Sequence, residues 1–396
     1  MTVTRRDLLR GSLAAAALLA TGDVRRLLAA AGPAGRPPGE LAGTLPFLLE
    51  PDEPLDRLLY DGLDARLYSD LSELTVEDPV TPPESFFVRT GVPAGYDPAE
   101  RRTLRLDGRV ERPADLAVET LAAESEDRGV HVVECAGNGR WARFGLLSAG
   151  RWAGVPLAPL VAAAGPLAGA AGVRVSGTDA HARPSTTSEP GCSWIFRLGE
   201  LASSGAFLAT ALDGRPLAPV HGAPVRLAVP GWYGCCWVKW VDRIEVVGDD
   251  EPATAQMREF AIRTHQGAVH ERARTYAPAT VDTAALPVRV ERWRSPGGTV
   301  YRVLGVLWGD DSVAAAGKLR IRFRPTDAWT PVSRPTAAAD GGFSVWSHTW
   351  ADPAPGRYLI QLDVDDPAVR SRRLDGGFYV RAVEVPPPSP STPAER

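Results

Sequence analysis

The stretch VHVVECAGNGRW, residues 130–141, runs a valine-rich segment into a cysteine and then into a glycine-rich turn. Alternating apolar residues predict a β-strand that ends near Cys135. Gly137 and Gly139 permit a sharp turn after it, because glycine adopts backbone conformations that other residues avoid. Cys135 is a buried apolar residue, half of a disulfide or a metal ligand. Arg140 would project near its thiol, and a nearby cation favours the thiolate, which is the form that binds metals.

Further donor and cationic residues stand in separate motifs. Arg89 follows ESFFV, His221 and Arg226 belong to HGAPVR, and Lys239 lies in CCWVKW. Each motif alone indicates little, since loop histidines and strand-flanking arginines are common on surfaces. Together they could clasp a phosphorylated, negatively charged organic cofactor. His131 shares a strand face with Cys135 and could form a two-ligand metal set with it, but a histidine packed in the sheet is the commoner outcome.

Length and composition predict a soluble protein of two domains. The chain has 396 residues, of which 44% are hydrophobic and 23% charged, and a single core seldom grows to that size. A net charge of −4 excludes the basic footprint of a nucleic-acid-binding domain. Four cysteines are present, at positions 135, 192, 235 and 236. Their spacing offers no CxxCH haem motif and no paired CxxC zinc motif, and the roles of Cys192, Cys235 and Cys236 stay open.

The first 31 residues resemble an export signal. Paired arginines in TRRDLL precede a short apolar run from Leu13 to Ala20, which is typical of the twin-arginine route. The run is shorter than the ~20 residues that cross a bilayer. We therefore expect an exported protein that is periplasmic, extracytoplasmic or anchored to the membrane by an uncleaved N-terminus.

The pattern along the chain predicts an α+β domain followed by an antiparallel β-sandwich. Short strands and helices alternate over 76–250, whereas period-two strands separated by Gly, Pro and Asp fill 286–385. Residues 32–75 are expected to be a linker with a short helix over 55–74. Residues 251–285 connect the two domains, and 386–396 form a disordered Pro-rich tail.

Five motifs, taken in order, resemble the sulfite oxidase family of molybdopterin-dependent oxidoreductases. They are FVR at 87–89, CAGNGR at 135–140, GTD at 177–179, HGAPVR at 221–226 and VKW at 238–240. The resemblance covers roughly 80–250, and the sandwich is similar to that family's immunoglobulin-like dimerisation domain. No haem motif or haem domain accompanies the matching region, so no haem is expected, and the resemblance implies a molybdenum–molybdopterin cofactor. It also implies a possible homodimer and a separate electron-transfer partner, either a cytochrome or a membrane redox protein, with no nucleic acid.

The resemblance also implies roles for individual residues. Cys135 would be the protein thiolate on molybdenum, and Arg89 and Arg140 would face the oxo ligand and orient an oxyanion. The pterin and its phosphate would contact Phe87, Val88, Arg89, Thr90, Asp179, His221, Arg226, Trp237, Val238 and Lys239.

Two departures affect the substrate end of the expected site. Gly139 stands where sulfite oxidisers carry an arginine, and Thr210 stands where they carry a tyrosine. We therefore expect an intact cofactor site and an altered substrate site, in an enzyme that transfers an oxygen atom to or from a small oxyanion or an S- or N-oxide. The alternatives are a sulfite dehydrogenase proper, an enzyme like methionine sulfoxide reductase, and a catalytically inactive secreted binding protein.

Overall fold

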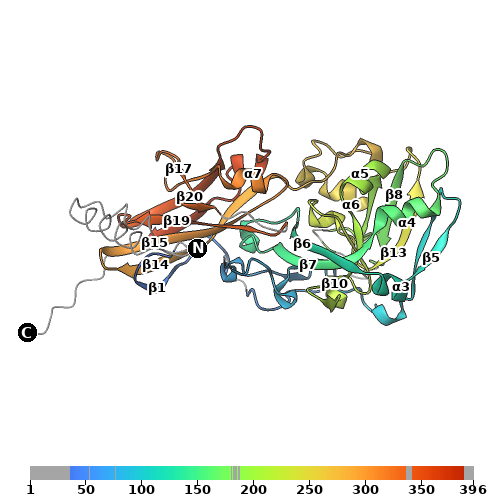
Figure 1. The fold of residues 1–396 in the computed structure, drawn as a ribbon, viewed down its shortest axis with the longest axis horizontal. Coiled ribbons are helices and arrows are strands. Elements are labelled where there is room, and N and C mark those ends of the chain that lie inside the picture. The colour runs from blue at the N-terminus through green and yellow to red at the C-terminus, as the bar shows by residue number, and fades with distance from the viewer. Residues whose placement is uncertain are drawn as a thin grey trace, which may run out of the picture.

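The computed structural model describes residues 36–387, apart from 53, 76, 180, 182–184, 186–187 and 336–340. The chain forms an α+β body and a β-sandwich side by side along the long axis of the molecule (Figure 1). The predicted signal at 1–31 and most of the predicted tail at 386–396 lie outside the described residues. No helix in the described part is long and apolar enough to cross a membrane.

Two five-stranded sheets build the α+β body. One carries a parallel pair, β4 with β13, among antiparallel neighbours, and its order is β5 (Ala114–Ala117), β4 (Thr103–Gly108), β13 (Val241–Val247), β8 (Gly172–Gly177), β9 (Ser193–Arg197). The other is antiparallel and consists of β11 (Arg215–Pro216), β10 (Phe207–Leu212), β7 (Leu147–Pro156) and β6 (Glu126–Glu134), with β12 (Arg226–Ala228) on β10. The strands predicted over 103–110 and 172–179 are β4 and β8.

Short helices connect these strands, namely α3 (Val118–Ala123), α4 (Leu157–Ala164), α5 (Leu198–Ser203) and α6 (Ala255–Phe260). The helix predicted over 156–165 is α4. The helix predicted over 115–125 begins only at Val118, because the residues before it pair with β4 as β5. A two-stranded sheet of β2 (Arg66–Leu67) and β3 (Val88–Arg89) lies beside the body and sets Arg66 opposite Arg89.

Two antiparallel sheets form the sandwich, as expected for 286–385. The first consists of β1 (Glu40–Leu45), β14 (Ala284–Ser295), β15 (Gly298–Trp308), β19 (Ser344–Ala351) and β18 (Arg334–Pro335). The second consists of β17 (Thr330–Pro331), β16 (Leu319–Arg322), β20 (Gly356–Val364) and β21 (Arg381–Val385). Helices α7 (Ser312–Ala316) and α8 (Arg372–Asp375) complete this half.

The segment predicted to be a linker differs from the expectation in two ways. Its residues 40–45 form β1, which pairs with β14 from Glu40 opposite Arg294 to Leu45 opposite Val290. The helix predicted over 55–74 is wrong, since this stretch holds only 3-10 turns and β2. Tyr60 and Gly62 have φ angles of 61° and 55°, and left-handed backbone interrupts a right-handed helix.

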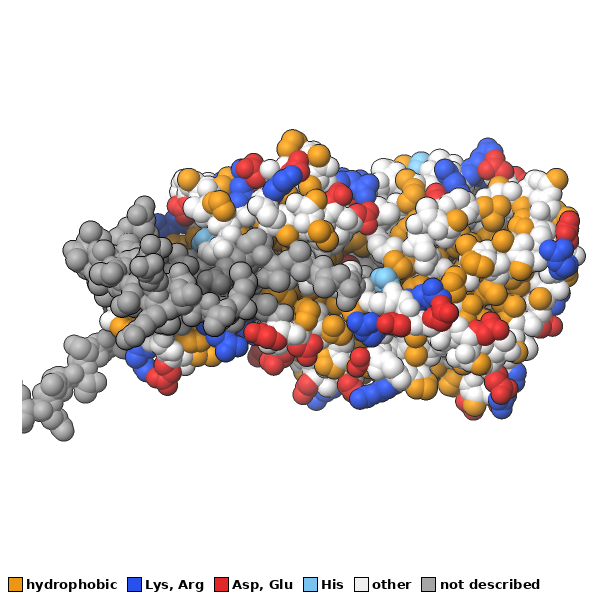
Figure 2. All heavy atoms as spheres, viewed as in Figure 1, with side chains coloured by type: hydrophobic (Ala, Val, Ile, Leu, Met, Phe, Trp, Pro, Cys, Tyr) orange, Lys and Arg blue, Asp and Glu red, His pale blue; other side chains and the backbone are white. Residues whose placement is uncertain are grey.

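The surface carries mixed charge. Figure 2 shows acidic, basic and apolar side chains interspersed over the face in view, which agrees with the small net charge of −4. The interior is rich in tryptophan, and the indoles of Trp152, Trp194, Trp237, Trp240, Trp308 and Trp346 are fully buried.

Candidate active site

A cavity of about 800 Å³, counting its open mouth, lies in the α+β body. Its wall gathers segments that are far apart in sequence, including the end of β3, the turn after β6, the segment after β8, and the loop before β13. The predicted site residues that line it are Phe87, Val88, Arg89, Thr90, Cys135, Asp179, His221, Arg226, Trp237 and Lys239. The fold thus brings most of the separate motifs together around one space.

Strand β6 delivers Cys135 to this cavity. The strand ends at Glu134, and the backbone N–H of Cys135 still donates to Leu146 O at 2.9 Å. The chain then turns, with Asn138 N donating to Cys135 O at 2.8 Å and Gly137 N donating to the sulfur at 3.4 Å. Burial raises the pKa of this thiol, and the nearby Arg89 acts in the opposite direction.

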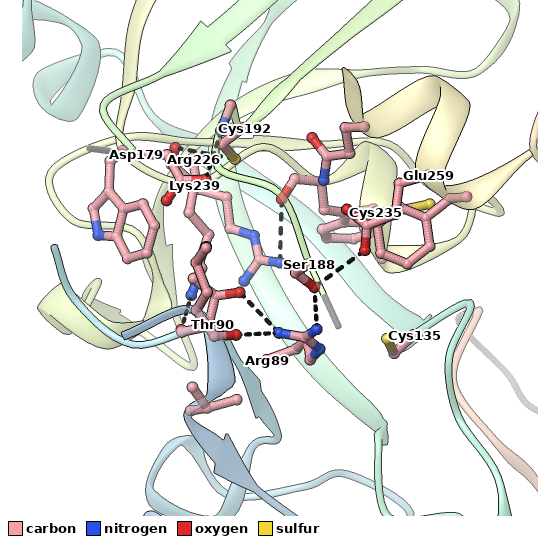
Figure 3. Close-up of a pocket in the computed structure, with 18 of the residues that line it drawn as sticks. Arg89, Thr90, Cys135, Asp179, Ser188, Cys192, Arg226, Cys235, Lys239 and Glu259 are labelled. Carbon is pink, nitrogen blue, oxygen red and sulfur yellow. Dashed lines mark hydrogen bonds between the residues drawn. The ribbon is translucent and has the colours of Figure 1, made fainter. Parts of the chain in front are cut away.

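Arg89 is held beside the thiol by a polar chain visible in Figure 3. Its guanidinium donates to Leu63 O, to Ser188 Oγ and, at 3.2 Å, to Thr90 Oγ1. The Ser188 hydroxyl in turn donates to Glu259 Oε1 at 3.1 Å. Burial lowers the pKa of Arg89. The residue after it, Thr90, has a φ of 82°, and such sparsely populated backbone often marks functional sites.

Two buried cations stand at the other side of the cavity. Lys239 Nζ donates to Thr90 O at 2.5 Å and to Val220 O at 3.1 Å, and burial lowers its pKa to about 7. The Arg226 guanidinium lies 5.4 Å from the Trp152 ring centroid and 5.7 Å from that of Trp237. Burial lowers the pKa of Arg226 to about 10. Neither cation has a carboxylate partner among the described residues.

Asp179 and His221 complete this side. The Asp179 carboxylate lies 2.8 Å from His181 Nε2 and accepts from Gly191 N at 3.2 Å. Burial raises the pKa of Asp179, and His181 opposes that shift. His221 Nε2 lies 3.0 Å from Pro83 O, and burial lowers the pKa of His221 to about 4. His221 is therefore neutral at pH 7 and acts as a hydrogen-bonding group rather than a cation.

Two predicted residues do not reach the cavity. Arg140 is exposed and donates from Nη2 to Val380 O at 2.8 Å, so the prediction that it faces the metal is wrong. The 3-10 turn at Arg140–Ala142 directs this side chain outward toward the sandwich. Val238 is fully buried, its carbonyl accepts from Leu227 N at 2.8 Å, and it lies behind the wall.

The structure adds residues that no motif pointed to. Arg66 lies opposite Arg89, and Arg263 extends from the short turn after α6. A Cβ built on Gly137 would lie 3.6 Å from Arg263 Nη1 and 3.8 Å from the Cys135 sulfur. Arg66 and Arg263 are not among the residues that line the cavity, whereas Ser188, Gln256, Glu259 and Phe260 are wall residues that no motif indicated. Several come from 251–285, which was expected to be a plain connection. The i, i+3 pair of Met257 and Phe260 was the one signal there for a helix against the core.

The structure also shows where the other cysteines and His131 lie. All four cysteines are free thiols; Cys192 and Cys235 line the cavity, whereas Cys236 is buried. His131 points its Nε2 at Arg128 O, 2.8 Å away, and is packed in the sheet. Within the described residues no group of three His, Cys, Asp or Glu side chains could hold a metal ion.

The cations and the thiol of this cavity fit a phosphorylated cofactor that brings its own metal ligands. The buried Arg226 Nε makes no hydrogen bond to the described residues, and an unpaired buried cation is costly unless an anion joins it. The Cys135 thiol at the opposite side belongs to no group of three possible metal ligands among the described residues, so it suits a metal whose other ligands are not protein atoms. The cations at one side of the cavity and the thiol at the other match a molybdopterin whose phosphate contacts the cations.

Comparison with known proteins identifies a domain and several similar enzymes. Residues 90–255 match the oxidoreductase molybdopterin binding domain family. Mitochondrial sulfite oxidase of Rattus norvegicus is 28% identical over 208 residues, which are 48% of this chain and 37% of that protein. Sulfite oxidase of Gallus gallus is 30% identical over 207 residues, which are 48% of this chain and 44% of that protein.

Residues 90–255 are a molybdopterin binding domain, and the chain is similar to the sulfite oxidase family of molybdopterin oxidoreductases.

The chain is also similar to Nitrate reductase [NADH] 2 of Phaseolus vulgaris, with 30% identity over 222 residues, which are 52% of this chain and 23% of that protein. The matched part is thus less than half of each of these relatives. The structure of the sulfane dehydrogenase SoxCD from Paracoccus pantotrophus matches with a TM-score of 0.59 at 19% identity and covers 91% of this chain and 96% of that one. The likeness in fold therefore includes both the α+β body and the sandwich.

Proposed function

We propose that this chain is an exported molybdenum-cofactor oxidoreductase that transfers an oxygen atom to or from a small oxyanion or an S- or N-oxide. One observation carries the proposal: the buried Cys135 thiol lies across the cavity from Arg226 and Lys239 (Figure 3). The thiol suits a soft metal and the cations suit a phosphate.

The residues divide the work of holding the cofactor. Cys135 would bind the metal, and Arg226 and Lys239 would bind the phosphate. Asp179 would accept from ring N–H donors, and Trp237 would give the flat pterin an apolar surface. When bound, this cofactor supplies two-electron oxygen-atom transfer.

An anionic substrate suits the mouth of the cavity. Arg89, Arg66 and Arg263 place three guanidinium groups near Cys135. Asp64, 3.8 Å from Arg66, balances part of this positive charge, and a bound anion would balance more of it. Arg66 and Arg89 lie directly opposite each other on paired strands, so the fold holds two like charges close together although this is destabilising. Their role would be to attract and orient the oxyanion before the reaction.

Sulfite is the second, narrower candidate. The three arginines favour a compact oxyanion of its kind over a neutral oxide. Gly139 counts against it, since the arginine of the sulfite oxidisers is missing from that position. A substrate panel with artificial electron donors and acceptors separates these possibilities. It would include sulfite, other sulfur and nitrogen oxyanions, and neutral S- and N-oxides.

The panel has a defined expected result. Protein purified with its cofactor should turn over at least one oxyanion, and neutral oxides should react more slowly at equal concentration. Molybdenum-loaded protein that converts no member of the panel in either direction would count against the proposal and would favour a binding role.

Export, the electron partner and assembly are parts of the same proposal. Arg5 and Arg6 support export by the twin-arginine route, and replacing both with lysine should retain the protein in the cytoplasm when cell fractions are compared. A cytochrome or membrane redox protein would exchange the electrons. The sandwich would support a homodimer, which light scattering of the purified protein would detect, and an interface well below ~1,000 Å² would argue against it.

A further inference from the structure

Glu134, the residue directly before Cys135, is held by side chains of the sandwich half of the chain. Its side chain is 1% exposed. The carboxylate accepts from Trp308 Nε1 at 2.9 Å, from Tyr379 Oη at 2.9 Å and from Arg373 Nη1 at 3.3 Å. Trp308 ends β15, and the other two lie in α8 and the segment that leads into β21. A carboxylate at the end of β6 is therefore bound mainly from the neighbouring domain.

Arg373 also holds the residue on the other side of Cys135. Its Nη2 donates to Ala136 O at 3.0 Å and to Arg263 O at 2.8 Å. Its guanidinium carbon lies 4.8 Å from the ring centroid of Tyr233, in the loop that continues to Trp237 and Lys239. One arginine thus touches the cysteine segment, the turn that carries Arg263, and the loop behind the cavity.

We propose that Glu134 and Arg373 form a clamp through which the sandwich fixes the position of the Cys135 thiol. The clamp grips the cysteine from both sides, through the Glu134 carboxylate and the Ala136 carbonyl. The planar guanidinium fork can bind both at once, which an ammonium group on a flexible chain cannot do with the same geometry. The sandwich is then a working part of the site as well as a surface for assembly.

Because the clamp is buried, its charged groups need a complete set of hydrogen-bond partners. Taking a carboxylate and a guanidinium out of water is favourable only when their remaining donors and acceptors are satisfied. Here Trp308 and Tyr379 supply further hydrogen bonds to Glu134, while two backbone carbonyls accept from Arg373. Few alternative arrangements would satisfy these groups equally well, so the network specifies one position for the turn after β6.

The chain offers a matched control in Glu291. This carboxylate is also buried, at 5%, and it also accepts from an indole, Trp293 Nε1 at 2.9 Å, and from an arginine, Arg302 Nη1 at 3.3 Å. Both donors lie within β14 and β15, inside the sandwich. Removing the charge of Glu291 therefore perturbs a similar buried network without touching either neighbour of Cys135.

The experiment compares Glu134→Gln, Arg373→Lys and Tyr379→Phe with Glu291→Gln. It rests on the proposed function, because the readouts are molybdenum content, the Mo(V) electron paramagnetic resonance spectrum, kcat and KM of the loaded enzyme, and the thermal midpoint. Groups behind a metal ligand typically change activity by about 10–100-fold when replaced. We expect such a loss in kcat, a changed Mo(V) spectrum and little change in KM for Glu134→Gln and Arg373→Lys.

Tyr379→Phe removes one hydroxyl and should fold even where the charge variants do not. It should shift the spectrum in the same direction by a smaller amount. Glu291→Gln should lower the midpoint but leave the spectrum and kcat unchanged. A wild-type spectrum in all three clamp variants would overturn the clamp, as would an equal change in Glu291→Gln. Wild-type protein without molybdenum would instead overturn the proposed function, and the clamp with it.

Discussion

Gly139 explains at the residue scale why the cysteine motif departs from that of the sulfite oxidisers. A Cβ built on Gly139 would lie 3.1 Å from Trp141 Nε1 and 3.8 Å from Phe378 Cζ. A side chain at this position would therefore need a small shift of the Trp141 indole, while its contact with Phe378 would be ordinary. Arg140 is likewise turned outward to Val380 O. The cations near the Cys135 thiol come from elsewhere, from Arg66, Arg89 and Arg263.

Replacing Arg263 and Arg140 separately tests this reassignment. Arg263→Gln should lower kcat/KM for an anionic substrate by about 10–100-fold, since a hydrogen bond to a charged group contributes ~1.5–3 kcal/mol. Arg140→Gln should change it by less than about threefold, because exposed residues contribute little. Steady-state kinetics of both variants on the same substrate measure the two changes in kcat/KM. The reverse ranking would restore the sequence-based assignment of Arg140.

Lys239 gives the cofactor-free protein a distinctive dependence on pH. Its folded pKa is about 7, below the ordinary value of 10.5, because of burial. Between these values the folded protein binds fewer protons than the unfolded chain, so stability rises with pH. Below about pH 7 both states are protonated and the penalty is fully present.

Denaturant unfolding of cofactor-free protein at pH 7 and pH 9 should therefore show a gain of ~2–3 kcal/mol at the higher pH, at 1.36 kcal/mol per pH unit. Lys239→Met should remove this gain. An equal slope in the variant would show that Lys239 does not titrate in this range. Cofactor binding should also flatten the slope, because a phosphate favours the charged lysine.

Cys135→Ser tests the ligand assignment itself. The serine hydroxyl is close in size to the thiol, so the thermal midpoint should change little. Turnover of any panel substrate should fall at least about a hundredfold, since a neutral hydroxyl is a poor replacement for a soft thiolate ligand. Turnover close to the wild-type rate would rule out Cys135 as the metal ligand.

At the scale of elements, the sequence predicted the strands whose apolar residues alternate regularly and the turn that lies within a compact motif. The period-two segments at 103–110 and 172–179 became β4 and β8, and the cysteine turn followed its strand as expected. Arg263 and Glu259 could not be found this way, because they act through the three-dimensional placement of α6 and carry no motif. The β1 strand was also missed, since five of its six residues are at least partly exposed and its pairing with β14 spans about 250 residues.

Strand β1 provides a test at this scale. A chain that begins at Pro46 lacks strand β1 and residues 36–39, compared with a chain that begins at Arg36. The shorter chain should lose about 1–3 kcal/mol of stability, from a few backbone hydrogen bonds worth ~0.5–1 kcal/mol net each. Thermal or denaturant unfolding of both forms measures the difference. Identical unfolding midpoints would show that β1 contributes nothing to the sandwich.

At the scale of the whole molecule, the two halves meet at the turn that presents Cys135. Glu134 and Ala136 contact the sandwich half through Arg373, while Arg381 of β21 donates to Arg143 O beyond the same turn. The cavity belongs to the α+β body, yet the position of its thiol depends on both halves. The likeness in fold to SoxCD covers 91% of the chain and so includes both halves.

The most direct test of the central claim is the molybdenum and pterin content of the protein purified from a host that makes the cofactor. Elemental analysis and pterin fluorescence after oxidation give both numbers per chain. A single thiol and one phosphate-binding end predict about one molybdenum and one pterin per chain. Less than about a tenth of either, in folded protein from such a host, would contradict the account.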